Sequence, residues 1–185
     1  MERISGREVY RNAWMSVRED RVRRADGGEG VYGVVDKPDF ALVVPYQGDG
    51  EGVAVDGVAG EGFWMVEQFR YPVGRRAWEF PQGTSTTGAE AEALARDELE
   101  EETGLRAGSL HRIGFLYAAY GMSSQGCSVW LATDLVAGRP RREETEADMV
   151  SGFVPRGRVR DLVAAGGIAD GPSLAALWMA EAHLP

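Results

Sequence analysis

The sequence predicts an α/β or α+β domain built on a mixed β-sheet, and three features of the chain support this fold class. Short segments rich in β-forming residues recur along the chain, a strongly periodic helix separates them near the middle, and two further helices follow at the end. With 185 residues, 44% of them hydrophobic, the chain is long enough for one domain with a buried core.

The N-terminal third has the pattern of strands joined by turns. Apolar and polar residues mix from Glu8 to Arg24 as in exposed strands, and the segment 31–35 has the character of a returning hairpin strand after a turn at 25–30. Two apolar runs, 40–46 and 62–71, predict buried strands. The glycine-rich stretch between these two runs predicts a mobile hairpin loop.

The strongest helix signal runs from about Ala89 to Glu102. Thr87 and Glu90 have the spacing of a capping box, in which each side chain satisfies a backbone donor of the other, and Gly104 suits the position just past the helix end. Beyond this helix, the pattern predicts three strands followed by two helices: 110–118, 128–135, 149–155, 156–165 and 172–184.

The charge balance and the cysteine count limit the classes of function. A formal net charge of −9 argues against a nucleic-acid partner, because such binding needs Lys and Arg to neutralise phosphates. A small anionic substrate still fits if a local positive group or a bound metal supplies the counter-charge. Cys127 is the sole cysteine, so no intrachain disulfide is expected. Neither a secretory signal nor a membrane span is apparent, so we expect a cytoplasmic protein without a membrane partner.

The segment 97–105, DELEEETGL, places five acidic residues close together on the predicted helix. Glu98, Glu101 and Glu102 stand at i, i+3 and i+4, so their carboxylates share one face and repel one another. Such a face is either simply solvated or holds a hard divalent cation. Mg²⁺ and Mn²⁺ bind carboxylate oxygens and complete their shell with substrate phosphates.

The stretch 78–105 resembles the Nudix box, the signature of the Nudix hydrolases. Gly83 fits the first glycine of that pattern, Glu98 begins its Glu-apolar-x-Glu-Glu-x-Gly-apolar tail, and the spacing is intact over 23 residues. The resemblance therefore favours metal binding over a solvated face. Four further segments are similar to the ADP-ribose pyrophosphatase group of the family: 9–22, 67–83, 114–126 and 163–180.

The resemblance extends to fold, assembly and activity. It implies that residues 1–38 form an N-terminal β-extension that helps to make a homodimer, and that residues 39–185 form a Nudix domain, an α/β/α sandwich. The implied activity is hydrolysis of a pyrophosphate bond in a nucleoside diphosphate linked to another group. The expected substrate is ADP-ribose, cleaved to AMP and ribose 5-phosphate, with Mg²⁺ or Mn²⁺ as the cofactor.

The same resemblance assigns the metal ligands. Glu98 and Glu102 are expected as the principal ligands, and Glu101 as a ligand or a water-orienting group. Gln82, just before the box glycine, is expected to contribute its backbone carbonyl.

The general base of the ADP-ribose pyrophosphatase group is a glutamate on a mobile loop late in the chain. The corresponding segment here is 141–150, in which Glu144 and Glu146 are the candidates and Asp148 is a third. A solvated acidic loop is the alternative, and only closure over the substrate would make one of these residues catalytic.

Substrate contacts are expected from residues outside the acidic face. Arg70, in the pattern 68-QFRYP-72, would hold a phosphate, with a surface ion pair as the alternative, and Glu79 would contact the substrate or orient Arg70. Gly83 belongs to the same expected site. Gly121 and Met122 fall in a loop that lies beside the terminal ribose in the group.

Two positions depart from the family pattern and leave other functions open. Ala89 replaces a usual glutamate and Asp97 a usual arginine, which removes a supporting salt bridge; Glu92 and Arg96, at i and i+4, could replace it. A dinucleoside polyphosphate or nucleotide-sugar hydrolase of the same family is one alternative. A module that senses a nucleotide without hydrolysing it is another, and the two departures are its only support.

Overall fold

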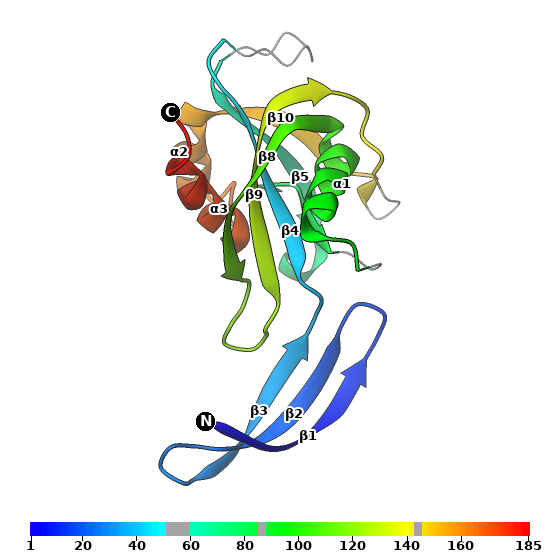
Figure 1. Cartoon of the computed structure of the whole chain (residues 1–185), viewed down its shortest axis with the longest axis vertical. Helices are drawn as coiled ribbons and strands as arrows, with labels where there is room; N and C mark the ends of the chain where they lie inside the picture. The colour runs from blue at the N-terminus through cyan, green and yellow to red at the C-terminus, as the bar shows by residue number, and fades with distance from the viewer. Residues whose placement is uncertain (51–59, 85–87, 143–145) are drawn as a thin grey trace.

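The structure, a computed structural model, describes residues 1–50, 60–84, 88–142 and 146–185. The chain forms a small N-terminal sheet that projects from a larger layered body (Figure 1). The small sheet is antiparallel, in the order β1-β2-β3. Its strands are β1 (Glu2–Arg11), β2 (Ser16–Arg23) and β3 (Glu29–Asp36).

A mixed sheet forms the middle layer of the body, in the order β10-β5-β4-β9-β8, with β6 added to β5 and β7 added to β4. The pair β4–β9 is parallel, and the other strand pairs described in this sheet are antiparallel. Within the described residues its strands are β4 (Phe40–Gln47), β5 (Gly62–Arg70), β6 (Arg75–Glu79), β7 (Gln82–Thr84), β8 (Leu105–Tyr117), β9 (Gly126–Ala137) and β10 (Val150–Pro155).

Helices cover both faces of this sheet. Helix α1 (Ala91–Thr103) packs on one face, and α2 (Arg156–Ala164) and α3 (Gly171–Glu181) pack on the other (Figure 1). The period-two alternation of β4 explains this sandwich, because successive side chains point to opposite faces. Ala41 and Val43 join the core under α1, whereas Leu42 and Val44 join the core under α2 and α3. The predicted α/β/α sandwich with a mixed sheet is confirmed.

The connection between the two sheets is held by hydrogen bonds to the loop between β8 and β9. The backbone N–H of Val35 donates to the carbonyl of Met122 at 2.8 Å, and the Gln125 side chain donates to the carbonyl of Pro38 at 2.8 Å. The N–H of Gly126 donates to the Asp39 carboxylate at 2.7 Å. The short segment between β3 and β4 is therefore anchored at both ends.

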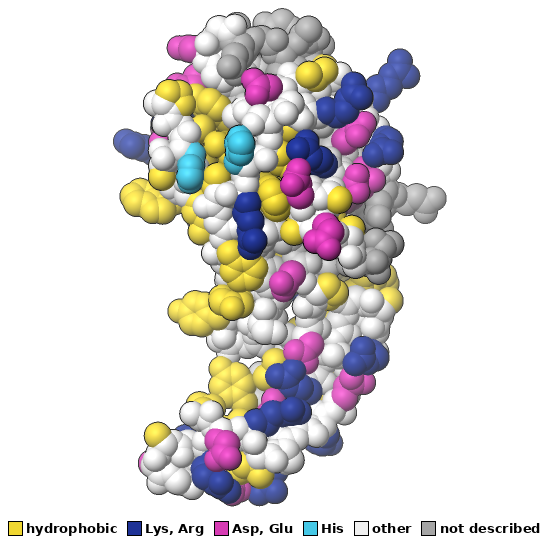
Figure 2. All heavy atoms as spheres, viewed as in Figure 1, with side chains coloured by type: hydrophobic (Ala, Val, Ile, Leu, Met, Phe, Trp, Pro, Cys, Tyr) yellow, Lys and Arg dark blue, Asp and Glu magenta, His cyan; other side chains and the backbone are white. Residues whose placement is uncertain are grey.

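The surface of the N-terminal sheet carries charges of both signs. Figure 2 shows basic and acidic side chains interspersed over it, and many of them form ion pairs, such as Arg7 with Glu19 at 2.6 Å. Every residue of β1 is exposed. Because exposed ion pairs contribute little stability, this sheet relies on its backbone hydrogen bonds and on its attachment to the body.

The ends of α1 differ in part from the prediction. Gly104 stands just past the helix as expected, with φ at 76°, but the helix begins at Ala91 with Glu90 as its N-cap and without a side-chain cap bond. The predicted capping box is therefore wrong for Glu90, and Thr87 lies outside the described residues. Arg96 does pair with Glu92, at 3.0 Å, as the i, i+4 spacing predicted.

The remaining differences concern short strands and loops. Strand β1 begins at Glu2, well before the predicted start, and β6 and β7 were not predicted. The residues of β6 and β7 lack a clear alternation of apolar and polar side chains. Pairing of β6 with β5 and of β7 with β4 makes them strands. Most of the predicted mobile loop, 51–59, lies outside the described residues. Across the described residues, none of the helices combines the length and apolarity that crossing a bilayer requires.

Replacing Gly104 by alanine is expected to destabilise the fold by about 1–2 kcal/mol, since φ is positive there. A Cβ at Gly104 would also lie 2.7 Å from the backbone nitrogen of Pro140. Gly157→Ala in α2 is the matched control, because a Cβ there meets open space and alanine favours a helix. Urea unfolding of both variants measures the difference; equal stabilities would contradict the account of this helix end.

Candidate active site

The acidic face of α1 packs against β7. A Cβ added at Gly83 would overlap the carboxylate of Glu98, so only glycine leaves that carboxylate its place. The backbone N–H of Gln82 donates to Oε2 of Glu102 at 3.3 Å. Glu98 and Glu102, two of the predicted ligands one helical turn apart, thus contact Gly83 and Gln82 on β7.

Glu102 is buried in an acidic environment. Its exposed fraction is 1%, and burial raises its pKa well above the usual value, as do the carboxylates of Glu98, Glu146 and Glu79. Arg70 opposes this effect only in part. A buried carboxylate with like charges around it is stabilised by a cation, so the donor set fits a divalent metal ion.

Glu101 lies toward a different neighbour. Its carboxylate is 3.9 Å from the guanidinium of Arg141, which also lies 3.8 Å from Glu100. Within the described part of the chain, no group of three or more His, Cys, Asp and Glu side chains is arranged as a metal site. The roles of Glu98, Glu101 and Glu102 as metal ligands stay a prediction.

Arg70 and Glu79 form a bidentate ion pair between neighbouring strands. Nε of Arg70 donates to Oε2 of Glu79 at 3.1 Å, and a second guanidinium nitrogen donates to Oε1. Gln68 also donates to Glu79, at 2.8 Å. Glu79 is buried and burial raises its pKa, whereas 43% of the Arg70 side chain is exposed. Glu79 thus pairs with Arg70, and its role in orienting Arg70 for a substrate stays a prediction.

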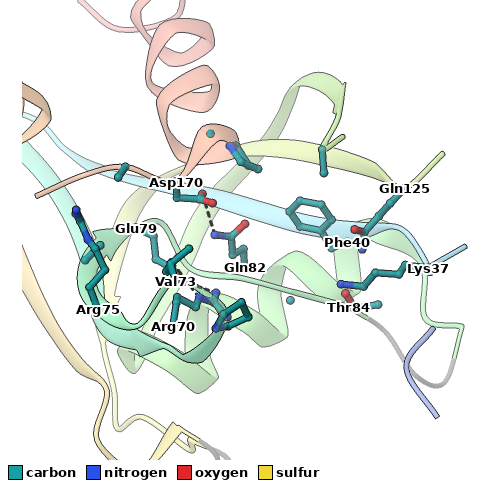
Figure 3. Close-up of a pocket in the computed structure, with 17 residues that line it drawn as sticks. Lys37, Phe40, Arg70, Val73, Arg75, Glu79, Gln82, Thr84, Gln125 and Asp170 are labelled. Carbon is teal, nitrogen blue, oxygen red and sulfur yellow. Dashed lines mark hydrogen bonds and ion pairs between the residues drawn. The ribbon is translucent and has the colours of Figure 1, made fainter. Parts of the chain in front are cut away.

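A pocket of about 600 Å³ opens beside β7 and is lined by Arg70, Glu79, Gln82 and Gly83 (Figure 3). Its other polar lining residues were not predicted as site residues: Lys37, Arg75, Thr84, Gln125 and Asp170. Phe40 supplies an aromatic surface next to them. The pocket therefore combines cationic groups with hydrogen-bond acceptors, as a phosphorylated sugar or nucleotide requires.

Asp170 fixes the side chain of Gln82. Its Oδ2 accepts from Nε2 of Gln82 at 3.1 Å and from the N–H of Ser173 at 2.9 Å, so the same carboxylate caps α3. The sequence signal for this role was the helix start itself, in which an Asp precedes a Pro near the first turn. Nothing in the local pattern indicated that this cap would also reach β7.

Two candidate bases of the late acidic segment, Glu146 and Asp148, are among the described residues. The charge of Glu146 contributes to the raised pKa of Glu102, whereas Asp148 pairs with Arg76 on β6. Glu144 lies outside the described residues. Arg142 donates to the carbonyl of Glu102 at 3.1 Å and so fastens the start of this loop to the end of α1.

Gly121 and Met122 stand apart from the pocket. Both lie in the loop between β8 and β9, where the Gly121 carbonyl accepts from the hydroxyl of Tyr32 and the Met122 carbonyl accepts from Val35. Met122 lines a smaller hollow of about 340 Å³ with Tyr32, Tyr117 and Tyr120. Their part in substrate binding stays a prediction.

Comparison with known proteins places this geometry in a family. A sequence model of the NUDIX domain matches residues 47–176, which include β7, α1 and the late loop. The chain belongs to the Nudix hydrolase family. A second model, the nucleoside diphosphate sugar hydrolase N-terminal domain, matches residues 1–35 of this Nudix hydrolase.

Two curated relatives and one solved structure are similar to this Nudix hydrolase. It is 34% identical to an ADP-ribose pyrophosphatase of Mycobacterium tuberculosis (strain ATCC 25618 / H37Rv) over 83% of this chain and 70% of that protein. It is 40% identical to an ADP-ribose pyrophosphatase of Bacillus subtilis (strain 168) over 53% of this chain and 54% of that protein. A crystal structure of an ADP compounds hydrolase matches with a TM-score of 0.80 at 18% identity, covering 98% and 92% of the two chains, and shows the same fold.

Gly83→Ala is expected to weaken Mn²⁺ binding by at least about tenfold, because the new methyl group displaces the Glu98 carboxylate. Calorimetric titration of the folded protein with Mn²⁺ measures this effect. Gly33→Ala on β3 is the control, since a Cβ there meets open space. Unchanged Mn²⁺ affinity in Gly83→Ala would remove Glu98 from the expected ligand set.

Proposed function

We propose that this Nudix hydrolase cleaves the pyrophosphate bond of ADP-ribose to give AMP and ribose 5-phosphate in a reaction that depends on a divalent metal. The observation that carries the proposal is the Glu98–Glu102 pair on α1, set against β7 at the edge of a pocket that contains Arg70. The two similar curated proteins are both ADP-ribose pyrophosphatases, which supports this choice of substrate.

Glu98 and Glu102 would hold Mg²⁺ or Mn²⁺, with Glu101 and the backbone carbonyl of Gln82 as further ligands. The burial of Glu102 among carboxylates and the fit of Glu98 against Gly83 support this set. The metal would supply charge neutralisation at the phosphate oxygens and a more acidic bound water.

The side chains around the pocket would bind the substrate and handle the proton. Arg70, held in orientation by Glu79, presents its guanidinium to a phosphate oxygen, and Gly83 gives the phosphate close access to the backbone. Glu146 would take the proton of the attacking water, with Glu144 as the alternative. The contribution of the Glu146 charge to the raised pKa of Glu102 supports Glu146 as the base. The ion pair of Asp148 with Arg76 argues against Asp148, the third candidate.

Two other functions compete with this proposal. A nucleotide-sugar or dinucleoside polyphosphate hydrolase would use the same pocket, and the match of residues 1–35 to a nucleoside diphosphate sugar hydrolase domain favours the former over the latter. A sensing module without turnover is disfavoured. Retention of Glu98, Glu101 and Glu102 argues against it, and the exposed Arg96–Glu92 pair would give α1 a small part of the support that the family's usual pair gives.

Turnover of a substrate panel tests the proposal. The panel contains ADP-ribose, a nucleoside diphosphate hexose, a diadenosine polyphosphate and a nucleoside triphosphate, each with Mg²⁺ or Mn²⁺. The highest kcat/KM is expected for ADP-ribose. A higher kcat/KM for another compound of the panel would make that compound the substrate in place of ADP-ribose. Metal-dependent binding of a compound without turnover of any of them would favour the sensing module.

We further propose that the protein is a homodimer formed through the N-terminal sheet, and that it is cytoplasmic. Large apolar side chains of this sheet are exposed, among them Tyr10 at 51%, Trp14 at 70% and Val31 at 68%, and a second copy would cover them. Sedimentation combined with activity measurements tests the assembly; a fully active monomer would contradict it. Cell fractionation tests the location.

A further inference from the structure

We propose that Lys37 is a second phosphate-binding residue of the pocket, separate from Arg70, and that it takes one phosphate of the nucleoside diphosphate substrate. This inference rests on the proposed function, because it names how the same pocket would recognise the same substrate class. Four observations on the described residues carry it.

The first observation is the position of Lys37. It lies between β3 and β4, at the point where the chain passes from the N-terminal sheet into the body, and it lines the pocket beside Phe40, Thr84 and Gln125. Figure 3 shows its side chain directed toward Thr84, at the end of the pocket remote from Arg75. Since the backbone is anchored here by the bond from Gln125 to the Pro38 carbonyl, the side chain starts from a fixed point.

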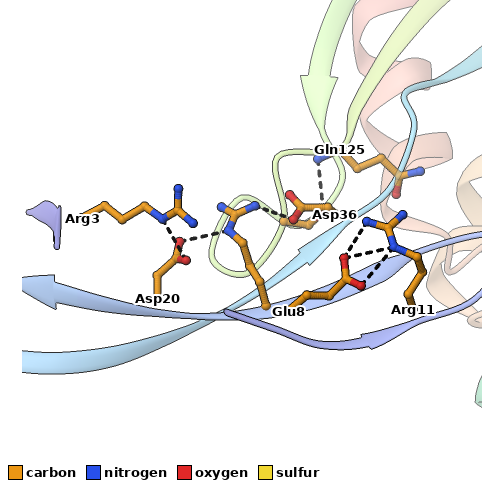
Figure 4. A network of polar contacts seen from close by, with 8 residues as sticks. Arg3, Glu8, Arg11, Asp20, Asp36 and Gln125 are labelled. Carbon is orange, nitrogen blue, oxygen red and sulfur yellow. Dashed lines mark hydrogen bonds and ion pairs between the residues drawn. The ribbon is translucent and has the colours of Figure 1, made fainter. Parts of the chain in front are cut away.

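The second observation is that the acids next to Lys37 in the sequence are engaged elsewhere. Asp36 accepts from the guanidinium of Arg18 (Figure 4). Asp39 accepts from the backbone N–H of Gly126 at 2.7 Å. In the described part of the chain, Lys37 itself has no ion pair and no side-chain hydrogen bond. No side chain in the described ranges therefore neutralises its positive charge.

The third observation is the contrast with the other cations of the pocket. Arg70 is neutralised by its bidentate contact with the buried Glu79, and Arg75 donates to the carbonyl of Gly166. Among the cations of the pocket, Lys37 is thus the one whose donors are all unengaged within the described residues and so open to an entering anion. An ammonium group offers three donors on a flexible stem and suits a phosphate as a point charge.

The fourth observation links Lys37 to the acidic face of α1. Thr84, beside Lys37, directly follows Gly83, and Gly83 contacts Glu98. A phosphate bound at Lys37 would lie next to the strand against which the expected metal ligands pack. Arg70 and Lys37 would then contact different phosphates of one substrate, which would favour a diphosphate over a monophosphate.

Kinetics of two Lys37 variants test the inference. Lys37→Gln is expected to lower kcat/KM for ADP-ribose by about tenfold to a hundredfold, mainly through KM, because a hydrogen bond to a charged group is lost. Lys37→Arg keeps the charge and should recover most of the loss. Arg106→Gln, which removes one exposed charge from β8 outside the pocket, is the control and should match the unmodified chain.

Chemical labelling gives a second readout that does not depend on turnover. Because Lys37 is the only lysine of the chain, an amine-acylating reagent modifies only Lys37 and the N-terminal amine. In EDTA, saturating ADP or ADP-ribose should slow acylation of Lys37 but not of the N-terminus, whereas adenosine, which lacks phosphate, should slow neither. Mass spectrometry of the Lys37 peptide measures the rates.

The outcomes separate this inference from the proposed function. If the unmodified chain hydrolyses ADP-ribose and Lys37→Gln does so within twofold of its kcat/KM, the inference is wrong and the proposed function stands. If the chain hydrolyses no member of the panel but ADP protects Lys37, the phosphate contact stands and the proposed function is wrong.

Discussion

Replacing Glu102 by glutamine should lower kcat for ADP-ribose by about a thousandfold, since it removes the charge of a proposed metal ligand, and a bound metal stabilises the transition state by several kcal/mol. Only 1% of Glu102 is exposed, and the charges of Glu98, Glu146 and Glu79 raise its pKa, so glutamine fits its volume while it ends the repulsion. Steady-state kinetics with Mg²⁺ measures the loss.

The stability of this variant distinguishes a functional from a structural role. Without metal, Glu102→Gln is expected to unfold at the same or a higher urea concentration than the unmodified chain, because a buried unneutralised carboxylate is unfavourable. Asp161→Asn, at an exposed position of α2 outside the pocket, is the control for activity. Loss of activity together with marked loss of stability would show that Glu102 serves the fold rather than the metal.

Replacing Arg70 by alanine should destabilise the protein by about 2 kcal/mol and also weaken substrate binding. The change leaves Glu79 buried without its cation, which is costly, although the partial exposure of Arg70 places the effect below that of a fully buried pair. Glu79→Gln is expected to cost less. It removes the buried charge and keeps a partner for Gln68 and Arg70. Urea unfolding of the two variants measures the asymmetry.

The penalty of Arg70→Ala should depend on pH. Burial already raises the pKa of Glu79 and Arg70 opposes that rise, so its removal raises the pKa further. A carboxyl with a raised folded-state pKa binds more protons in the folded than in the unfolded state, so its cost is largest above that pKa and falls as the pH falls. The stability difference should therefore shrink on acidification toward the ordinary glutamate range; a constant difference would contradict this reading of the pair.

The sequence was sufficient for those parts of the site that depend on local spacing. One helical face carries Glu98 and Glu102, and Gly104 ends that helix, because both follow from the period of a helix and from backbone geometry. The buried strands β4 and β5 were likewise evident from their apolar residues. The family resemblance supplied the sandwich topology.

Contacts between distant segments could not be predicted in this way. Asp170 bonds to Gln82 across 88 positions, and Lys37 shares a pocket with Arg70 and Asp170 only because β3, β5 and α3 converge there. A local pattern contains no information on such pairings. The start of α1 was misplaced for a related reason, since Ala89 and Glu90 lie in the connection from β7 rather than in the helix.

The measurement that tests the central claim most directly is the appearance of AMP and ribose 5-phosphate from ADP-ribose, in Mg²⁺ and in EDTA, for the unmodified chain and for Glu102→Gln. The account predicts equimolar products from the unmodified chain with Mg²⁺, none in EDTA, and about a thousandfold slower formation in the variant. Equal product formation by the variant, or formation in EDTA, would contradict the assignment of Glu102 and the metal to this reaction.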